Sequence, residues 1–182
     1  MIKVLAFDLV GVLVSEKDIE MSLEEGKLER LFGPNKDDAS YLKEARKIIK
    51  KDSIIMRTTE NLIEKLYEVK DKELFKKIKE KFPNVKIIIA TNHVSFIRNF
   101  IGDELGAQFL DDVIISAEIH RVKPDKDFYE YILRKYNLLP KELLFLDDNV
   151  KNVESAKELG IKVIKVNKNT NILDEIIKNI NV

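Results

Sequence analysis

The chain has 182 residues, of which 45 % are hydrophobic and 35 % charged, and its 32 basic residues balance its 32 acidic ones. This length suits one domain, or one domain with an insertion, and the apolar content excludes a disordered chain. The balanced charge argues against a nucleic-acid-binding protein, although it leaves room for a local basic patch. The absence of cysteine excludes disulfides, thiolate metal sites and a thiol nucleophile.

Targeting and membrane signals are also lacking in this sequence. The N-terminus runs directly into the short apolar segment 2–7, which is too short and too early for a signal peptide. Apolar stretches stay well below the roughly 18 residues that a membrane-spanning helix needs. We therefore expect a cytoplasmic protein that does not enter the membrane, and the sequence leaves its oligomeric state undefined.

The first predicted strand, Val4 to Phe7, is a short buried run that ends at Asp8 and Gly11. Residues 15–70 differ in character, because they are charged and their apolar positions recur with a helical period. Breaks are expected near 33–35 and around 52–58, and strand patterns are absent. We expect a small helical insertion over residues 15–70. Its three apolar faces comprise Leu23, Leu28, Leu31 and Phe32; Tyr41, Leu42, Ala45, Ile48 and Ile49; and Leu62, Ile63, Leu66 and Tyr67.

After the insertion, predicted helices and strands alternate regularly. The helices are expected over 72–82, 94–105, 125–136, 149–159 and 172–180, and the strands over 85–90, 113–115, 143–146 and 161–166. Such alternation predicts a mostly parallel sheet with right-handed crossovers. The expected fold is therefore α/β, with a Rossmann-like three-layer core formed by residues 1–14 and 71–182 and with the helical insertion after the first strand.

Four short polar segments follow in a fixed order, and three of them end predicted strands. They are Asp8, the pair Thr91-Asn92, Lys123 in a loop before Pro124, and the pair Asp147-Asp148. Open parallel sheets bind ligands just beyond the carboxyl ends of their strands. The order therefore predicts one site that combines an aspartate, a hydroxyl, a lysine and two further carboxylates.

Each segment also has a structural explanation when it is taken alone. Asp8 suits a nucleophile that attacks a phosphoryl group, but it equally suits a turn cap. Thr91 and Asn92 suit phosphate oxygens, although both residue types are common helix N-caps. Lys123 suits charge neutralisation, and it also suits a solvated position before a helix-starting proline. Four capping accidents in this order are improbable, so we interpret the segments together as one site.

The pair Asp147-Asp148 predicts a metal site. Adjacent carboxylates at a buried strand end repel each other unless a cation or protons intervene. Mg²⁺ prefers a few carboxylate oxygens together with water and substrate phosphate. The alternative is that one aspartate caps the helix that starts at Asn149. The carboxylates alone do not separate Mg²⁺ from Mn²⁺, because both ions accept oxygen ligands.

With these motifs, nearly the whole chain resembles the haloacid dehalogenase superfamily, whose members are mostly Mg²⁺-dependent phosphatases. The resemblance implies that Asp8 is the nucleophile, that Thr91, Asn92 and Lys123 bind phosphate and serve catalysis, and that Asp8, the Val10 carbonyl, Asp147 and Asp148 hold Mg²⁺. The insertion resembles the helical cap of the first subclass, which selects the substrate. In pattern the chain is most similar to the branch of soluble epoxide hydrolase phosphatase domains and sugar-phosphate phosphatases.

Val10 departs from the family pattern. Phosphatases that the chain resembles usually carry an aspartate there, which protonates the leaving group and then activates water. General acid–base help of this kind is worth about 10²–10⁴-fold. We therefore expect a phosphatase of a small phosphorylated metabolite, acting through an aspartyl-phosphate. The alternatives are an impaired relative that binds metal and a phosphorylated ligand or partner, and a haloacid dehalogenase, which the paired aspartates disfavour.

Several further residues are weaker candidates. His93 follows Thr91-Asn92 and suits the site entrance or the missing acid, although a surface or helix-start histidine is the better interpretation. Arg121 suits either substrate phosphate or, preferably, a salt bridge. Glu16 is the nearest carboxylate after Val10. Three residues in the expected breaks of the insertion suit substrate or core, namely Phe32, Met56 and Arg57.

Overall fold

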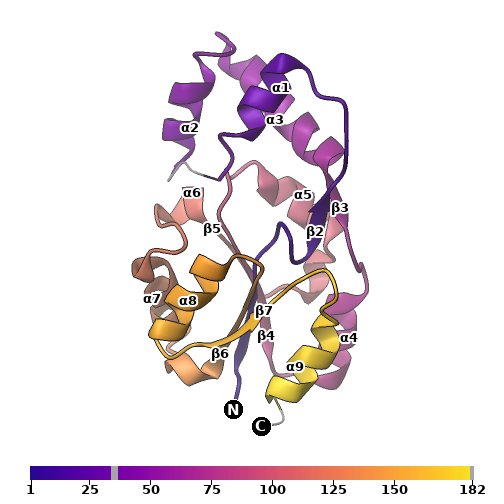
Figure 1. The fold of residues 1–182 in the computed structure, drawn as a ribbon, viewed down its shortest axis with the longest axis vertical. Coiled ribbons are helices and arrows are strands. Elements are labelled where there is room, and N and C mark those ends of the chain that lie inside the picture. Colours follow the sequence, from indigo (N-terminus) through magenta and orange to yellow (C-terminus); the bar gives the residue numbers. More distant parts are fainter. Residues whose placement is uncertain (34–36, 181–182) are drawn as a thin grey trace.

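A five-stranded parallel sheet forms the centre of the protein in this computed structural model, which describes residues 1–33 and 37–180. The strands lie in the order β5-β4-β1-β6-β7. Their bounds are Val4–Phe7 for β1, Lys86–Thr91 for β4, Asp112–Ile115 for β5, Leu143–Asp147 for β6 and Lys162–Lys165 for β7. The α/β class predicted from the alternation is thereby confirmed, with β1 between β4 and β6 (Figure 1).

Helices cover both faces of the sheet and make three layers. Alternate residues of β1 face opposite sides, since Leu5 and Phe7 join one apolar cluster and Val4 and Ala6 join another. The first cluster includes side chains of α4 (Leu74–Lys81), α5 (Ile97–Glu104) and α9 (Ile172–Ile180). The second includes side chains of α7 (Lys126–Lys135) and α8 (Val150–Glu158). The short helix α6 (Ser116–Ile119) directly follows β5.

The insertion contains three helices, as predicted, but it also contains two strands that the sequence pattern did not indicate. The helices are α1 (Leu23–Glu29), α2 (Asp38–Ala45) and α3 (Asp52–Leu66), and in Figure 1 they lie above the carboxyl ends of the sheet strands. Strands β2 (Val14–Glu16) and β3 (Tyr67–Val69) pair antiparallel where the chain leaves and re-enters the core. The prediction that no strand interrupts the helical insertion, with Tyr67 on a helical face, was wrong. Three-residue strands carry too little pattern, and each depends on a partner about fifty positions away.

The expected break around residues 52–58 was also wrong, because α3 is continuous there. Arg46 forms two hydrogen bonds to the Asp52 carboxylate, across the actual break between α2 and α3. Buried side chains of α3 repeat at helical spacing and pack against the core, which outweighs the low helix propensity of its β-branched residues. The other expected break, 33–35, lies largely outside the described residues. Within the described part of the chain, helices long and apolar enough to cross a membrane are absent.

Candidate active site

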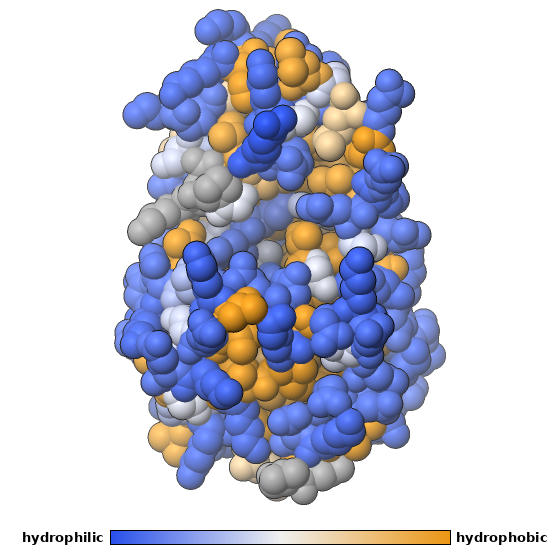
Figure 2. All heavy atoms as spheres, viewed as in Figure 1, coloured by the Kyte–Doolittle hydropathy of each residue, from blue (hydrophilic) through white to orange (hydrophobic). Residues whose placement is uncertain are grey.

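Strand order brings three predicted site segments to one edge of the sheet. Asp8 directly follows β1, Thr91 ends β4 and Asp147 ends β6, and β1 pairs with both other strands. The Asp8 amide continues this ladder by donating a hydrogen bond to the Leu146 carbonyl at 2.8 Å. The carboxyl ends of these strands point towards the helices α1 to α3, and the face drawn in Figure 2 is hollowed between those helices and the sheet part of the molecule.

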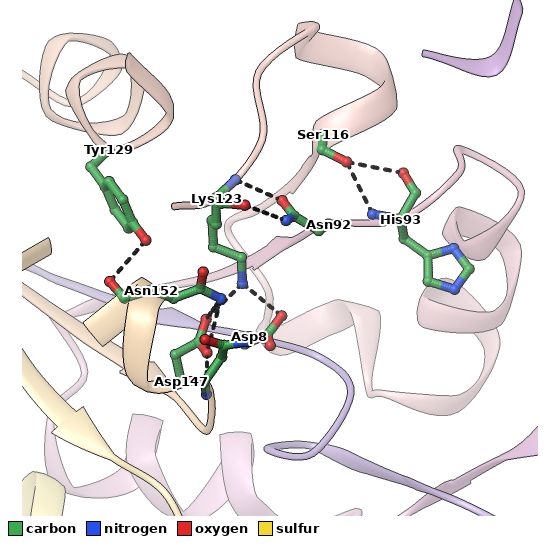
Figure 3. A network of polar contacts seen from close by, with 9 residues as sticks. Asp8, Asn92, His93, Ser116, Lys123, Tyr129, Asp147 and Asn152 are labelled. Atoms are coloured by element: carbon green, nitrogen blue, oxygen red, sulfur yellow. Dashed lines mark hydrogen bonds and ion pairs between the residues drawn. The ribbon is translucent and has the colours of Figure 1, made fainter. Parts of the chain in front are cut away.

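Lys123 joins two of these segments. Its Nζ lies 2.8 Å from Asp8 Oδ1 and 2.8 Å from Asp147 Oδ2, and its side chain is only 1 % exposed (Figure 3). Burial opposes the charge on Lys123, but the two carboxylates outweigh it and raise the lysine pKa. Burial also raises the pKa of Asp8 to about 6, against the opposing effect of Lys123. The Asp8 side chain keeps 14 % exposure, so it is the member of this trio that a ligand can reach.

Asn92 positions the loop that carries Lys123. Its side-chain Nδ2 donates to the Lys123 carbonyl at 2.8 Å, and its Oδ1 accepts from the Lys123 amide at 2.9 Å. The side chain thereby imitates a backbone pairing between the end of β4 and the loop before α7. Thr91 is buried beside it at the strand end. The structure therefore brings Thr91 and Asn92 to the predicted site, while their contact with phosphate stays a prediction.

In the acidic pair Asp147-Asp148, one carboxylate is held in place and the other is accessible to solvent. Asp147 is fully buried and accepts hydrogen bonds from the Asn149 amide at 2.8 Å and from Asn152 Nδ2 at 3.1 and 3.0 Å. Asp148 is exposed at the surface. Its carboxyl group still loses part of its hydration to surrounding protein atoms, and this loss, together with the nearby Asp147 charge, raises the Asp148 pKa. Helix α8 is capped by the Asn149 side chain, which accepts from the Lys151 amide, so neither aspartate is needed as its N-cap.

Carboxylate oxygens of Asp8, Asp147 and Asp148 lie within 4.8 Å of one another. The loop after β1 must come close to achieve this, and Gly11 makes it possible. Gly11 has φ +85°, and a Cβ there would lie 2.2 Å from Asp148 Oδ2. The Lys70 ammonium donates to the Gly11 carbonyl and so ties this loop to the segment that follows β3. In the sequence, Gly11 was noted as the end of the first predicted strand, and Lys70 was not among the candidate site residues.

Val10 is partly buried and packs against the apolar cluster that also contains Leu5. Its side chain therefore contributes apolar packing and no charge at the position where the phosphatases that the chain resembles usually carry an aspartate. The role of its carbonyl towards a metal remains a prediction. The arrangement as a whole combines a reachable carboxylate, a buried lysine and an oxygen-rich cluster, which suits a divalent cation and an anionic ligand.

The weaker candidates have separate outcomes. The interpretation of His93 as a surface or helix-start residue was wrong, because it is 2 % exposed and its Nε2 lies 3.0 Å from the Tyr67 hydroxyl. The burial of its imidazole was not predicted because its partner, Tyr67, belongs to strand β3, which the sequence pattern did not indicate. Arg121 lies 3.8 Å from Asp127 and over the Tyr131 ring, as expected for a salt bridge. In the insertion, one candidate is a core residue and two are exposed, namely Phe32, Met56 and Arg57.

Asn152 is the main site residue that lacked an assigned role. No role was predicted for it, yet its side-chain amide contacts both oxygens of Asp147, and its backbone carbonyl accepts a hydrogen bond from the Tyr129 hydroxyl at 2.9 Å. A usable signal existed, because an amide five positions after a strand-end aspartate lies on the first turn of the following helix. That spacing lets the side chain reach back to the carboxylate.

Comparison with known proteins finds curated relatives over short segments of the chain. The mouse bifunctional epoxide hydrolase 2 is 31 % identical over 72 residues, covering 40 % of this chain and 13 % of the relative. The glyceraldehyde 3-phosphate phosphatase of Methanocaldococcus jannaschii is 37 % identical over 59 residues, covering 32 % of this chain and 26 % of the relative. The chain thus matches about a quarter or less of the length of these two proteins.

Whole-chain similarity comes from structure. A haloacid dehalogenase family enzyme from Bacteroides thetaiotaomicron, solved as an aspartate-to-alanine mutant with magnesium and inorganic phosphate, superposes with a TM-score of 0.75 at 18 % identity. The match covers 96 % of this chain and 99 % of that one, and at this identity it shows the fold alone. A family model for haloacid dehalogenase-like hydrolases matches residues 2–160. This chain therefore belongs to the haloacid dehalogenase-like hydrolase family.

Proposed function

We propose that this protein is a Mg²⁺-dependent phosphatase that acts on a small phosphorylated metabolite through an aspartyl-phosphate intermediate. The observation that carries the proposal is the bridge from buried Lys123 to both Asp8 and Asp147, each at 2.8 Å. This bridge holds a reachable carboxylate beside a fixed positive charge at the carboxyl edge of the sheet. We further propose residues 1–14 and 71–182 as the catalytic core and residues 15–70 as its cap.

The donor set fits a magnesium ion. Asp8, Asp147 and Asp148 offer carboxylate oxygens within 4.8 Å of one another, and hard oxygen ligands are those that Mg²⁺ prefers. We propose the Val10 carbonyl as a fourth ligand. Bound there, the ion would relieve the repulsion among the three carboxylates and neutralise charge on phosphoryl oxygens. Magnesium and phosphate in the Bacteroides relative support this assignment.

The proposed reaction has two displacement steps. In the first, one Asp8 oxygen forms a bond to phosphorus while the bond from phosphorus to the leaving-group oxygen breaks, and that oxygen takes a proton. In the second, water attacks the same phosphorus, which releases inorganic phosphate and restores the Asp8 carboxylate. In this proposal, Lys123, Thr91 and Asn92 stabilise the equatorial oxygens, the contribution that usually dominates such reactions.

The leaving-group proton has no donor at position 10. Because Val10 carries no carboxylate, water or another side chain must supply this proton. The hydrolysis rate should fall least for substrates whose leaving groups need little protonation, such as acyl, aryl and anomeric phosphates. Given the glyceraldehyde 3-phosphate phosphatase among its relatives, phosphorylated carbohydrates are the first metabolite class to screen.

Hydrolysis of an aryl phosphate, with and without Mg²⁺, tests the proposal in wild type, Asp8→Asn and Val10→Asp. Mg²⁺-dependent turnover that disappears in Asp8→Asn supports the phosphatase. Activity that appears only in Val10→Asp would instead favour an impaired family member that binds ligand without turnover, the alternative that Val10 itself suggests. Turnover of a 2-haloacid that persists with a chelator would indicate a dehalogenase.

A further inference from the structure

His93 connects the proposed phosphate-binding strand end to the insertion. Its backbone belongs to the core, because Ser116 Oγ accepts from the His93 amide at 3.0 Å and donates to its carbonyl at 3.3 Å. Its ring points away from the Asp8–Lys123 cluster (Figure 3). The ring reaches the hydroxyl of Tyr67, which begins β3, the strand by which the chain returns from the insertion.

The hydrogen bonds of the imidazole define its tautomer. Nδ1 lies 3.2 Å from the Val94 carbonyl, which can only accept, so Nδ1 carries the hydrogen. Nε2 then holds a lone pair and accepts from the Tyr67 hydroxyl at 3.0 Å. With His93 neutral and Tyr67 protonated, both polar atoms of the ring are therefore satisfied.

Aromatic packing encloses this pair on both sides of the junction. The Phe32 ring, which follows α1, lies 5.0 Å from the His93 ring, and the Phe100 ring of α5 lies 5.9 Å from that of Tyr67. Tyr67 and His93 are 5 % and 2 % exposed. The pair thus connects core and insertion by a direct contact that is largely shielded from water.

Charged groups face the pair from four elements, but they do not reverse its neutrality. Asp38 of α2 favours protonation of His93, yet burial dominates and lowers the His93 pKa to about 4. Burial raises the pKa of Tyr67, as do the charges of Glu16 in β2, of Glu29 in α1 and of Asp8 after β1. Glu16 also stands directly opposite Tyr67 in the β2–β3 pair.

We propose that His93 and Tyr67 are a neutral pair of positioning residues that couples strand β3 to the end of β4, which presents Thr91 and Asn92. His93 is one residue from Asn92 and two from Thr91, so a displaced imidazole moves the backbone that presents these groups. This inference rests on the proposed function for the role of that strand end. The existence of the pair stands apart from it.

Nuclear magnetic resonance tests the pair without any activity. The chain has two histidines, so a His120→Gln variant assigns the His93 imidazole nitrogens. We expect the Nδ1–H tautomer, with unchanged nitrogen shifts from about pH 8 down to about pH 5.5. An Nε2–H tautomer, or protonation within that interval, would overturn the proposal.

The coupling is tested with two matched tyrosine variants. Tyr67→Phe removes the hydroxyl that contacts His93, whereas Tyr41→Phe removes the hydroxyl of another buried tyrosine, whose partner, the Thr59 hydroxyl at 2.5 Å, lies within the insertion. We expect Tyr67→Phe to weaken binding of inorganic phosphate with Mg²⁺ by about fivefold or more, measured by calorimetry. Tyr41→Phe should stay within about twofold of wild type.

Equal effects of the two tyrosine variants would reduce the pair to ordinary packing and overturn the coupling. Turnover of an aryl phosphate is recorded on the same samples. Loss of kcat in Tyr67→Phe at unchanged thermal stability supports positioning, whereas loss in proportion to stability contradicts it. Absent turnover in wild type contradicts the proposed function, while the phosphate titration and the imidazole spectra still decide the coupling.

Discussion

The Lys123 ammonium lies 2.8 Å from the Asp8 carboxylate, and both groups are largely withdrawn from water. The same nitrogen contacts Asp147, so one positive charge is shared between two carboxylates that would otherwise repel each other. A buried pair of this kind contributes little net stability compared with apolar residues, but breaking it leaves an uncompensated charge. The relationship therefore serves the site more than the fold.

Replacing Lys123 by methionine should damage both stability and turnover. Two unpaired buried carboxylates are expected to cost about 3–5 kcal/mol in the free energy of unfolding, measured with urea. Loss of the charge beside Asp8 should lower kcat for an aryl phosphate by about 10²–10³-fold. Lys126→Met is the control, because Lys126 contacts Glu158 on the surface and should matter little. Equal effects of both variants would contradict the role assigned to Lys123.

Asn152→Ala tests the support of the metal ligands. The variant removes an amide that contacts both Asp147 oxygens, at 3.1 and 3.0 Å, and leaves the carboxylate held by Lys123 and the Asn149 amide alone. Losing such an orienting group should weaken Mg²⁺ binding by about 10–100-fold, measured by calorimetry. The exposed neighbour Lys151→Ala provides a control on the same helix. Unchanged affinity in Asn152→Ala would show that Asp147 needs no such support.

Gly11→Ala tests the close approach of the loop after β1 to Asp148. A left-handed conformation costs a residue with a Cβ about 1–2 kcal/mol. The added carbon would also lie 2.2 Å from Asp148 Oδ2, so this carboxylate must move and Mg²⁺ affinity should fall at least about tenfold. Gly102→Ala is the matched control, because Gly102 lies inside α5 and, apart from the backbone of that helix, an added Cβ would have no neighbouring atom within 4 Å. The free energy of unfolding of Gly102→Ala should rise by about 0.5–1 kcal/mol, because alanine stabilises a helix interior relative to glycine.

Acid should destabilise the protein through His93. Burial lowers its pKa from 6.5 to about 4, so between these values the unfolded chain binds a proton that the folded protein excludes. Stability from this group is therefore complete above about pH 6.5 and is lost as the pH falls towards about 4, with a total on the order of 3 kcal/mol. Carboxylates titrate in the same interval.

The difference between wild type and His93→Gln isolates this contribution, because all carboxylates are common to both proteins. Urea unfolding is measured for both at several pH values. The difference in unfolding free energy should change with pH below about 6.5 and stay level above it. A difference that is independent of pH would show that His93 keeps its proton equilibrium on folding.

Much of the core followed from local pattern. Strand β1 and β6 are short apolar runs whose side chains are buried on both faces, and such runs are readable in one sequence. Asp8 and the Asp147-Asp148 pair stand where these two strands end, so predicting the strands also predicted where the carboxylates lie. The helical period likewise identified α1, α2 and the second half of α3 in the insertion, because each of these helices buries one face.

The sequence by itself thus determined the α/β alternation and the edge at which Asp8, Lys123 and the paired aspartates gather, because strand ends of a parallel sheet share one side. Only the tertiary structure decided the β2–β3 pairing and the burial of His93 against Tyr67. Each of these depends on partners distant in the chain or on the direction of a single side chain. Such contacts are set by packing in three dimensions, which leaves no periodic signal in the order of residues.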